Sequence, residues 1–209
     1  MLPASTRRPG EYKGPAAIIR LALQRPGELT LVCCGPLTNL AIALNVEPAL
    51  PQLLKSVVVV AGAYYVQGNM SWTAEFNTYA DPEAASQVFS SPFPELVALS
   101  LDLTTQLEMS REMWEKAGRT GTAVGRLLHA IYSASFEPVG TGYVEIHDAL
   151  AVAATLEPDL IECEPRTVVV HAGFDERGTT RLVDPARTSI GVSVDQDRFM
   201  QGLRTVFAV

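Results

Sequence analysis

Cysteine and positive charge are both scarce in this sequence. Three cysteines occur among 209 residues, and two of them, Cys33 and Cys34, are adjacent. Such a set does not match the disulfide framework of a small secreted protein, so we expect a reducing, cytoplasmic location. Sixteen Lys and Arg residues stand against 23 Asp and Glu, which gives a net charge of −7 with no basic block. This balance argues against a nucleic-acid partner and against an anionic membrane surface.

Long hydrophobic runs are missing as well. No apolar stretch approaches the roughly 20 residues that a membrane-spanning helix needs, so we expect no membrane partner. The first residues include Pro3 and Arg8 without an apolar segment after them, and they predict no signal peptide. The 47% apolar and 19% charged residues are ordinary for a globular protein. We therefore expect one domain over residues 1–209, in which 1–13 form an irregular leader.

Apolar runs alternate with helix-like segments along the chain. Strands are predicted for 29–34, 56–62 and 96–103, and the four consecutive valines of the second are typical of a strand buried on both faces. Helices are predicted for 14–25, 36–44, 81–90, 110–117, 121–136, 148–156 and 196–206. The segments 167–171 and 179–183 predict an antiparallel hairpin, followed by a strand at 189–194. This order predicts an α/β fold with an open, mainly parallel sheet flanked by helices and a small antiparallel hairpin near the C-terminus.

Three loops lie where such a sheet binds ligands, beyond the carboxyl ends of its strands: 34–36, 68–77 and 102–105. The loop 68–77 carries Asn69, Glu75, Phe76 and Asn77. Its carboxylate and amides can hold the hydroxyls of a polyhydroxylated ligand, while the ring packs against a sugar face. An extended backbone would point Glu75 and Asn77 to one side and Phe76 to the other. The alternative is a plain polar loop with a solvated Glu75.

Two further groups allow a structural and a functional interpretation. Cys34 either closes a strand as a small core residue or offers its backbone carbonyl to a hard cation, a role that ignores the side chain. Asp148 is either the cap of the helix that follows it or a ligand for a metal or hydroxyl, with His147 beside it as an acid. Asp102, near the end of a strand, either shapes the site from behind or caps a turn.

Together these segments resemble the inosine–uridine-preferring nucleoside hydrolase family. The similarity runs from about residue 15 to the C-terminus, in the expected order, through 27–39, 57–63, 68–69, 74–77, 81–85, 101–104 and 147–153. The resemblance implies hydrolysis of the N-glycosidic bond of a ribonucleoside to free base and ribose. It also implies a Ca²⁺ ion that holds and activates a water.

The resemblance assigns a role to each candidate residue. Asn69, Glu75 and Asn77 would hold ribose hydroxyls, and Phe76 would lie within the same sugar-binding loop. Asp148 would ligate the metal, Cys34 would supply its carbonyl, and His147 would stand near the leaving base as an acid.

One family feature does not occur in this sequence. The loop of the form Asp-Thr-Asp-Pro-Gly-x-Asp-Asp, which supplies most Ca²⁺ carboxylates and the general base, has no match. We therefore expect an N-terminally truncated fold in which Ca²⁺ binding is weak or lost. One hypothesis is an enzyme whose missing N-terminal segment comes from elsewhere, through a second chain, a mis-assigned start or a truncation. The other is a catalytically inactive homologue that binds ribose or a nucleoside, or only assembles. The missing strands would expose a sheet edge, which favours a homo-oligomer.

Overall fold

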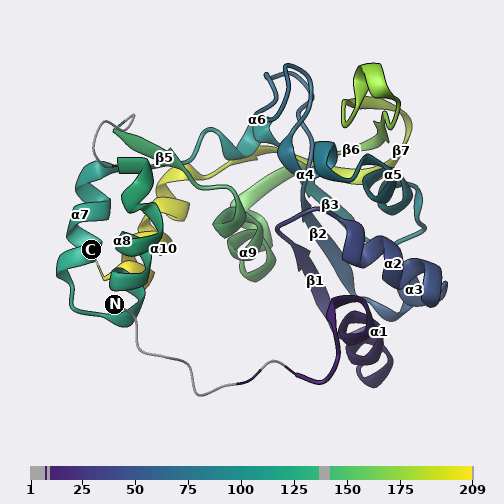
Figure 1. Cartoon of the computed structure of the whole chain (residues 1–209), viewed down its shortest axis with the longest axis horizontal. Coiled ribbons are helices and arrows are strands. Elements are labelled where there is room, and N and C mark those ends of the chain that lie inside the picture. Colours follow the sequence, from purple (N-terminus) through teal and green to yellow (C-terminus); the bar gives the residue numbers. More distant parts are fainter. Residues whose placement is uncertain (1–7, 9, 137–141, 209) are drawn as a thin grey trace.

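The computed structural model describes residues 8, 10–136 and 142–208 (Figure 1). Of the expected leader at 1–13, residues 8 and 10–13 carry no helix or strand, and the others lie outside the described residues. Among the described residues, no helix combines the length and the hydropathy needed to cross a membrane.

The central feature is a five-stranded sheet in the order β1-β2-β3-β7-β6. Its strands are β1 (Thr30–Cys33), β2 (Ser56–Val60), β3 (Leu96–Leu99), β6 (Ile161–Val170) and β7 (Thr180–Val194). The first four in this order run parallel, and β6 pairs antiparallel with β7. The predicted fold class, an open and mainly parallel sheet, is confirmed.

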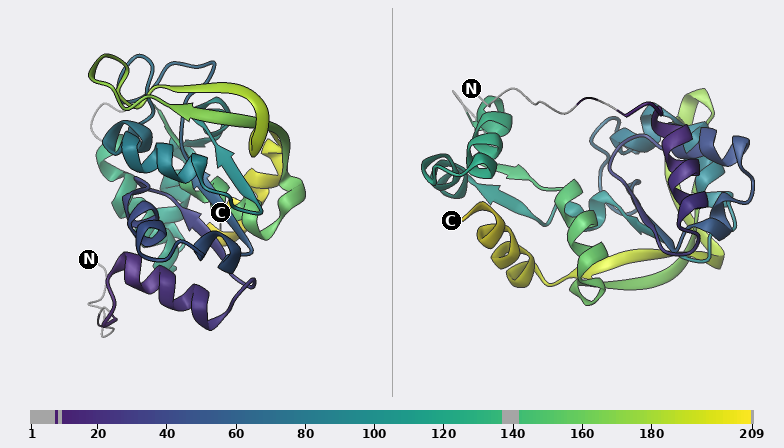
Figure 2. Two further views of the ribbon diagram at one scale, coloured as in Figure 1. Left: turned by 90° about the vertical axis from the view of Figure 1, so that its right-hand side faces the viewer. Right: turned by 90° about the horizontal axis from the view of Figure 1, so that it is seen from below.

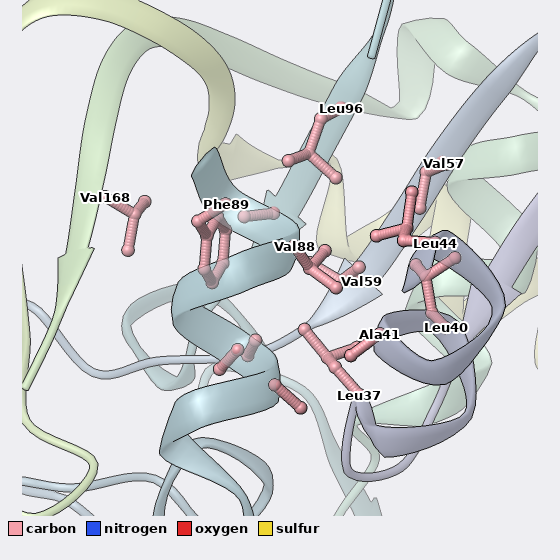
Figure 3. Close-up of a cluster of buried hydrophobic side chains, with 14 of the residues drawn as sticks. Leu37, Leu40, Ala41, Leu44, Val57, Val59, Val88, Phe89, Leu96 and Val168 are labelled. Carbon is pink, nitrogen blue, oxygen red and sulfur yellow. The ribbon is translucent and has the colours of Figure 1, made fainter. Parts of the chain in front are cut away.

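Strand β2 is buried on both faces, as its four valines predict. Val57 and Val59 belong to one apolar cluster, whereas Val58 and Val60 belong to another. The first cluster packs the sheet against α2 (Thr38–Val46) and α5 (Pro82–Ser90), as Figure 3 shows. It also includes residues of α1 (Gly14–Gln24) and α3 (Leu50–Leu53). The second cluster packs the sheet against α9 (Asp148–Leu156) and α10 (Gln196–Phe207). Helices therefore cover both faces of the sheet.

The C-terminal hairpin is longer than the sequence predicts. The segments 179–183 and 189–194 belong to one strand, β7 (Thr180–Val194), which pairs with β6 on both sides of an unpaired stretch at 184–187. Prolines at 165 and 185 interrupt the strand pattern of the sequence, because proline cannot donate a hydrogen bond to the neighbouring strand and is rare inside strands. The sequence therefore predicts shorter strands than the structure has. Register shifts at Glu162/Cys163 and Arg166/Thr167 accommodate the irregularity.

A helical lobe lies at the far end of the molecule from α1, α2 and α5 (Figure 2). It contains α7 (Arg111–Arg119), α8 (Ala123–Phe136) and a two-stranded antiparallel sheet of β4 (Glu108–Ser110) and β5 (Tyr143–Glu145). The helices were predicted, but this small sheet was not. The strand predicted for 96–103 is too long: β3 ends at Leu99 and α6 (Leu101–Thr104) follows, because the Thr104 N–H bonds back to the Ser100 carbonyl.

Candidate functional site

Glu75 organises the loop that follows β2. It is the N-cap of the short helix α4 (Phe76–Ala80), and its carboxylate accepts the N–H groups of Asn77 at 2.8 Å and Thr78 at 3.1 Å. The same carboxylate accepts the Gly62 N–H at 3.2 Å. Glu75 is only 3% exposed. The alternative of a solvated Glu75 is therefore wrong.

The backbone at 75–77 also differs from the expectation. It is not extended throughout, because the Glu75 carboxylate satisfies free N–H groups and so starts a helix at Phe76. The side chains still divide as predicted. Glu75 and Asn77 are buried, while Phe76 is 52% exposed.

Asn69 and Asn77 each use one side-chain atom in a hydrogen bond to the backbone of the loop or of β2. Asn77 Nδ2 donates to the Val60 carbonyl at 2.9 Å, and Asn69 Oδ1 accepts the Phe76 N–H at 2.8 Å. Within the part of the chain that the structure describes, Asn69 Nδ2 and Asn77 Oδ1 make no such bond. These two atoms, a donor and an acceptor, are the pair that can meet a ligand hydroxyl.

Asp148 does not occupy the cap position of the helix that follows it. It is the first residue of α9, preceded by His147 at the cap position, and that cap makes no side-chain hydrogen bond. The alternative of Asp148 as an N-cap is therefore wrong. Burial raises the pKa of the Asp148 carboxyl, and the neighbouring His147 opposes this shift.

The Asp148 carboxylate lies close to two other predicted site residues. Burial and then the charge of Asp148 raise the pKa of the Cys34 thiol. Burial also raises the pKa of the Glu75 carboxyl, against hydrogen bonds from Asn77, Thr78 and Gly62, and Asp148 adds to the rise. Cys34 follows β1 directly, and α9 packs against β1 and β2. The fold thus places Cys34 and the loop of Glu75 at the exits of β1 and β2, the two strands against which the helix of Asp148 packs.

His147 has a protein partner at each ring nitrogen. Nδ1 lies 2.8 Å from the Thr104 hydroxyl, and Nε2 lies 3.4 Å from Glu145 Oε2. The sequence placed Thr104 in a strand-exit loop but gave it no role. Glu145 carried no signal, because β5 was not predicted.

Asp102 holds the start of the site loop. Its carboxylate accepts the backbone N–H groups of Tyr64 at 2.8 Å and Tyr65 at 2.7 Å, together with the Ser100 hydroxyl at 3.0 Å. These contacts fix the backbone where the chain leaves β2, and they fit either interpretation of Asp102. Thr180, which the sequence did not single out, adds a second anchor, since its hydroxyl accepts the Ala63 N–H and donates to the Ala63 carbonyl.

The donors for a cation are few. Over the described residues, no three His, Cys, Asp or Glu side chains are grouped to hold a metal ion. The Asp148 carboxylate and the Cys34 carbonyl supply oxygens of the kind that Ca²⁺ prefers, but that ion takes about 6–8 of them. The described residues therefore do not fit a complete calcium site.

Comparison with known proteins identifies the family. The family model for inosine-uridine preferring nucleoside hydrolases matches residues 1–201, and the chain belongs to this family. Members of the family generally depend on a metal ion. The sequence is 35% identical over 195 residues to the pyrimidine-specific ribonucleoside hydrolase RihB of Escherichia coli O157:H7, covering 87% of this chain and 61% of that protein.

Solved structures agree on the fold. A plant nucleoside hydrolase superimposes with a TM-score of 0.88 at 27% identity, over 97% of this chain and 69% of its own. A purine-preferring ribonucleoside hydrolase from Gardnerella vaginalis gives a TM-score of 0.87 at 26% identity, over 99% of this chain and 68% of its own. The chain thus spans between three fifths and seven tenths of the length of these proteins.

Proposed function

We propose that this chain is part of a hydrolase that cleaves the N-glycosidic bond of ribonucleosides to base and ribose. The observation that carries the proposal is the arrangement of three segments: Cys34 follows β1, Glu75 caps α4 in the loop after β2, and Asp148 begins α9, which packs against both strands. A site at that edge is expected for an open α/β sheet. The E. coli relative is named as pyrimidine-specific and the Gardnerella structure as purine-preferring, so the preferred base is left open.

The sugar is held, in this proposal, by the loop after β2. Asn69 Nδ2 and Asn77 Oδ1 meet ribose hydroxyls directly. The Glu75 carboxylate offers about four lone-pair sites, of which three already accept N–H groups, so it has one left for a hydroxyl. Phe76 exposes its ring in the same loop, where it can pack on the sugar. His147 faces the leaving base.

We further propose Ca²⁺ as the metal, ligated in part by Asp148 and the Cys34 carbonyl. Such an ion supplies a held and activated water. Because the described residues offer too few oxygens, further donors must come from residues outside them. We propose a separate chain that contributes the N-terminal segment as the source; a homo-oligomer would add only further copies of the residues already present. The three free cysteines support a reducing, cytoplasmic location.

The shortage of cation donors also favours a second function. In this alternative the chain binds ribose or a nucleoside without cleaving it. The sugar-holding atoms of Asn69 and Asn77 need no metal, so binding would persist where catalysis is lost.

A paired assay separates the two functions. The purified chain is incubated with inosine or uridine and Ca²⁺, and base release is measured beside calorimetric binding of the same nucleosides. Release that disappears in Asp148→Ala supports the hydrolase, with Asp175→Ala, an exposed hairpin carboxylate, as the matched control. Binding that is weakened in Asn77→Ala without any release supports the alternative. If the chain neither binds nor cleaves the nucleosides, both proposed functions are overturned.

A further inference from the structure

The two partners of His147 come from different elements on either side of its ring. Thr104 is the last residue of α6 and is fully buried, and its hydroxyl lies 2.8 Å from Nδ1. Glu145 is the last residue of β5, and its side chain is 37% exposed. Its Oε2 atom lies 3.4 Å from Nε2. Both nitrogens of the ring are thus engaged within the protein.

The backbone around these residues is held by a short chain of hydrogen bonds. The Leu107 N–H donates to the Thr104 carbonyl, and the Ile146 N–H donates to the Leu107 carbonyl at 2.8 Å. Leu107 therefore links the segment that carries Thr104 to the one that carries His147. The separation of Thr104 from the imidazole is consequently fixed by backbone contacts and not only by the side chains.

Donor chemistry determines where the proton sits on a neutral ring. A carboxylate only accepts hydrogen bonds, so the charge of Glu145 beside Nε2 favours a proton on that nitrogen. A neutral imidazole carries one N–H, and its other nitrogen is then an acceptor. The Thr104 hydroxyl can donate to Nδ1, which makes the two contacts mutually consistent.

We propose that Thr104 and Glu145 are positioning residues that hold neutral His147 as the tautomer protonated on Nε2. The inference rests on the proposed function, in which His147 faces the leaving base, and it deepens that function. Thr104 is the permanent anchor, because its contact is short and buried. Glu145 is the exchangeable partner, because its contact is longer and reaches solvent. A leaving base takes the place of Glu145 beside Nε2 and accepts its N–H.

Nuclear magnetic resonance of the ring nitrogens tests the proposal without turnover. The sequence contains three histidines, so a chain labelled with ¹⁵N-histidine gives three sets of ring signals, and His147→Gln identifies the relevant one. Spectra are recorded at about pH 9, where histidine is ordinarily neutral. We expect His147 to show the Nε2–H pattern. A wild-type Nδ1–H pattern would overturn the proposal.

Variants separate positioning from mere packing. Thr104→Val removes the hydroxyl at nearly constant volume and should give a mixture of both tautomers, whereas Thr104→Ser should restore the Nε2–H form. Glu145→Gln should also move the signal toward a mixture. The matched control is Glu176→Gln, which removes a carboxylate 3.2 Å from His171 Nδ1 and should leave the His147 signal unchanged.

The outcomes remain distinct if a variant or the proposed function fails. If Thr104→Val does not fold, Thr104→Ser and Glu145→Gln still report on the tautomer, since the Glu145 side chain is partly exposed and its substitution is tolerated more easily. Identical His147 spectra in wild type and Glu145→Gln would overturn the role of Glu145. An Nε2–H pattern that responds to these variants in a chain without hydrolase activity would uphold the positioning and reject the proposed function alone.

Discussion

The carboxylate of Glu75 accepts the backbone N–H of Gly62, which lies 13 residues earlier in the chain. Gly62 has a φ of +93°, a conformation that favours glycine, at the point where the chain leaves β2. Glu75 also caps α4 at the other end of the loop. One buried side chain therefore ties together both ends of the segment that carries the candidate sugar-binding residues.

Removing this side chain should destabilise the protein. Glu75→Ala leaves three buried N–H groups without their acceptor, and we expect the unfolding free energy to fall by about 3 kcal/mol. Urea denaturation measures the change. Glu83→Ala is the control, because that side chain is 65% exposed and should change the free energy by about 0.5 kcal/mol at most. Equal losses in the two variants would contradict the role of Glu75.

The stability should also depend on pH through Glu75. Burial raises the pKa of its carboxyl above the usual value, so the folded state binds its proton more tightly than the unfolded state does. The stabilising contribution of this proton is present below the unfolded-state pKa of about 4.3 and is lost as the pH rises through the folded-state pKa. We expect wild type to lose stability relative to Glu75→Gln as the pH rises from about 4. Urea titrations at stepped pH measure this, and parallel curves would contradict it.

Asp102 should control the mobility of the loop start. The N–H groups of Tyr64 and Tyr65 bond to different oxygens of Asp102, so Asp102→Asn takes the acceptor from one of them and loosens the turn that both share. We expect these two amides to exchange with deuterium at least about tenfold faster, which corresponds to a loss of about 1.4 kcal/mol of local stability. Asp175→Asn, on the exposed hairpin, should leave their rates unchanged. Unaltered exchange in Asp102→Asn would show that the loop is held by other contacts.

The hairpin between β6 and β7 packs on α4 through a glycine. Gly178 has a φ of +74°, and a Cβ there would lie 2.5 Å from the Tyr79 Cα. Gly178→Ala should lower the unfolding free energy by at least about 2 kcal/mol through strain and clash, a drop of about 4–8 °C in Tm. Gly173→Ala is the control, because Gly173 has a φ of −65° and nothing within 4 Å of its added Cβ. Similar Tm values for both variants would argue against this packing role.

The adjacent cysteines should differ in reactivity. Burial and then the neighbouring Cys34 raise the pKa of the Cys33 thiol to about 12, whereas Cys34 is exposed. Because the thiolate is the nucleophile, only about one Cys33 in 10⁴ is reactive at pH 8. We expect iodoacetamide to modify Cys34 well before Cys33, as followed by mass spectrometry of the peptide that contains both. Equal rates would contradict the burial of the Cys33 thiol.

Local patterns predicted the parts of the fold that local chemistry determines. The valines of β2 indicated a strand covered on both faces, and the Asp81 carboxylate does cap α5 by accepting the Ala84 N–H. The small sheet of β4 and β5 escaped prediction because each strand is only three residues long and gains its structure from a partner far along the chain. Pairing of this kind leaves little trace in a short window of sequence.

In the candidate site, too, local patterns predict some features, whereas others depend on residues far along the chain. Strand-exit loops meet at one edge of a parallel sheet, so Cys34 and Glu75 were expected near each other. The burial of Glu75 was not expected, because a loop glutamate is ordinarily exposed. Glu145 became visible only once β5 placed it beside His147.

The contact between Thr180 and Ala63 joins residues 117 positions apart. A loop closure of that length is slow to form, since chain entropy opposes it until the intervening structure is in place. We expect the candidate site to assemble late in folding, after the sheet. Thr180→Val should then speed unfolding with little effect on the folding rate in stopped-flow measurements. A slower folding limb would instead place this contact in the folding nucleus, and the ligand-binding loop would be among the first parts of the protein to form.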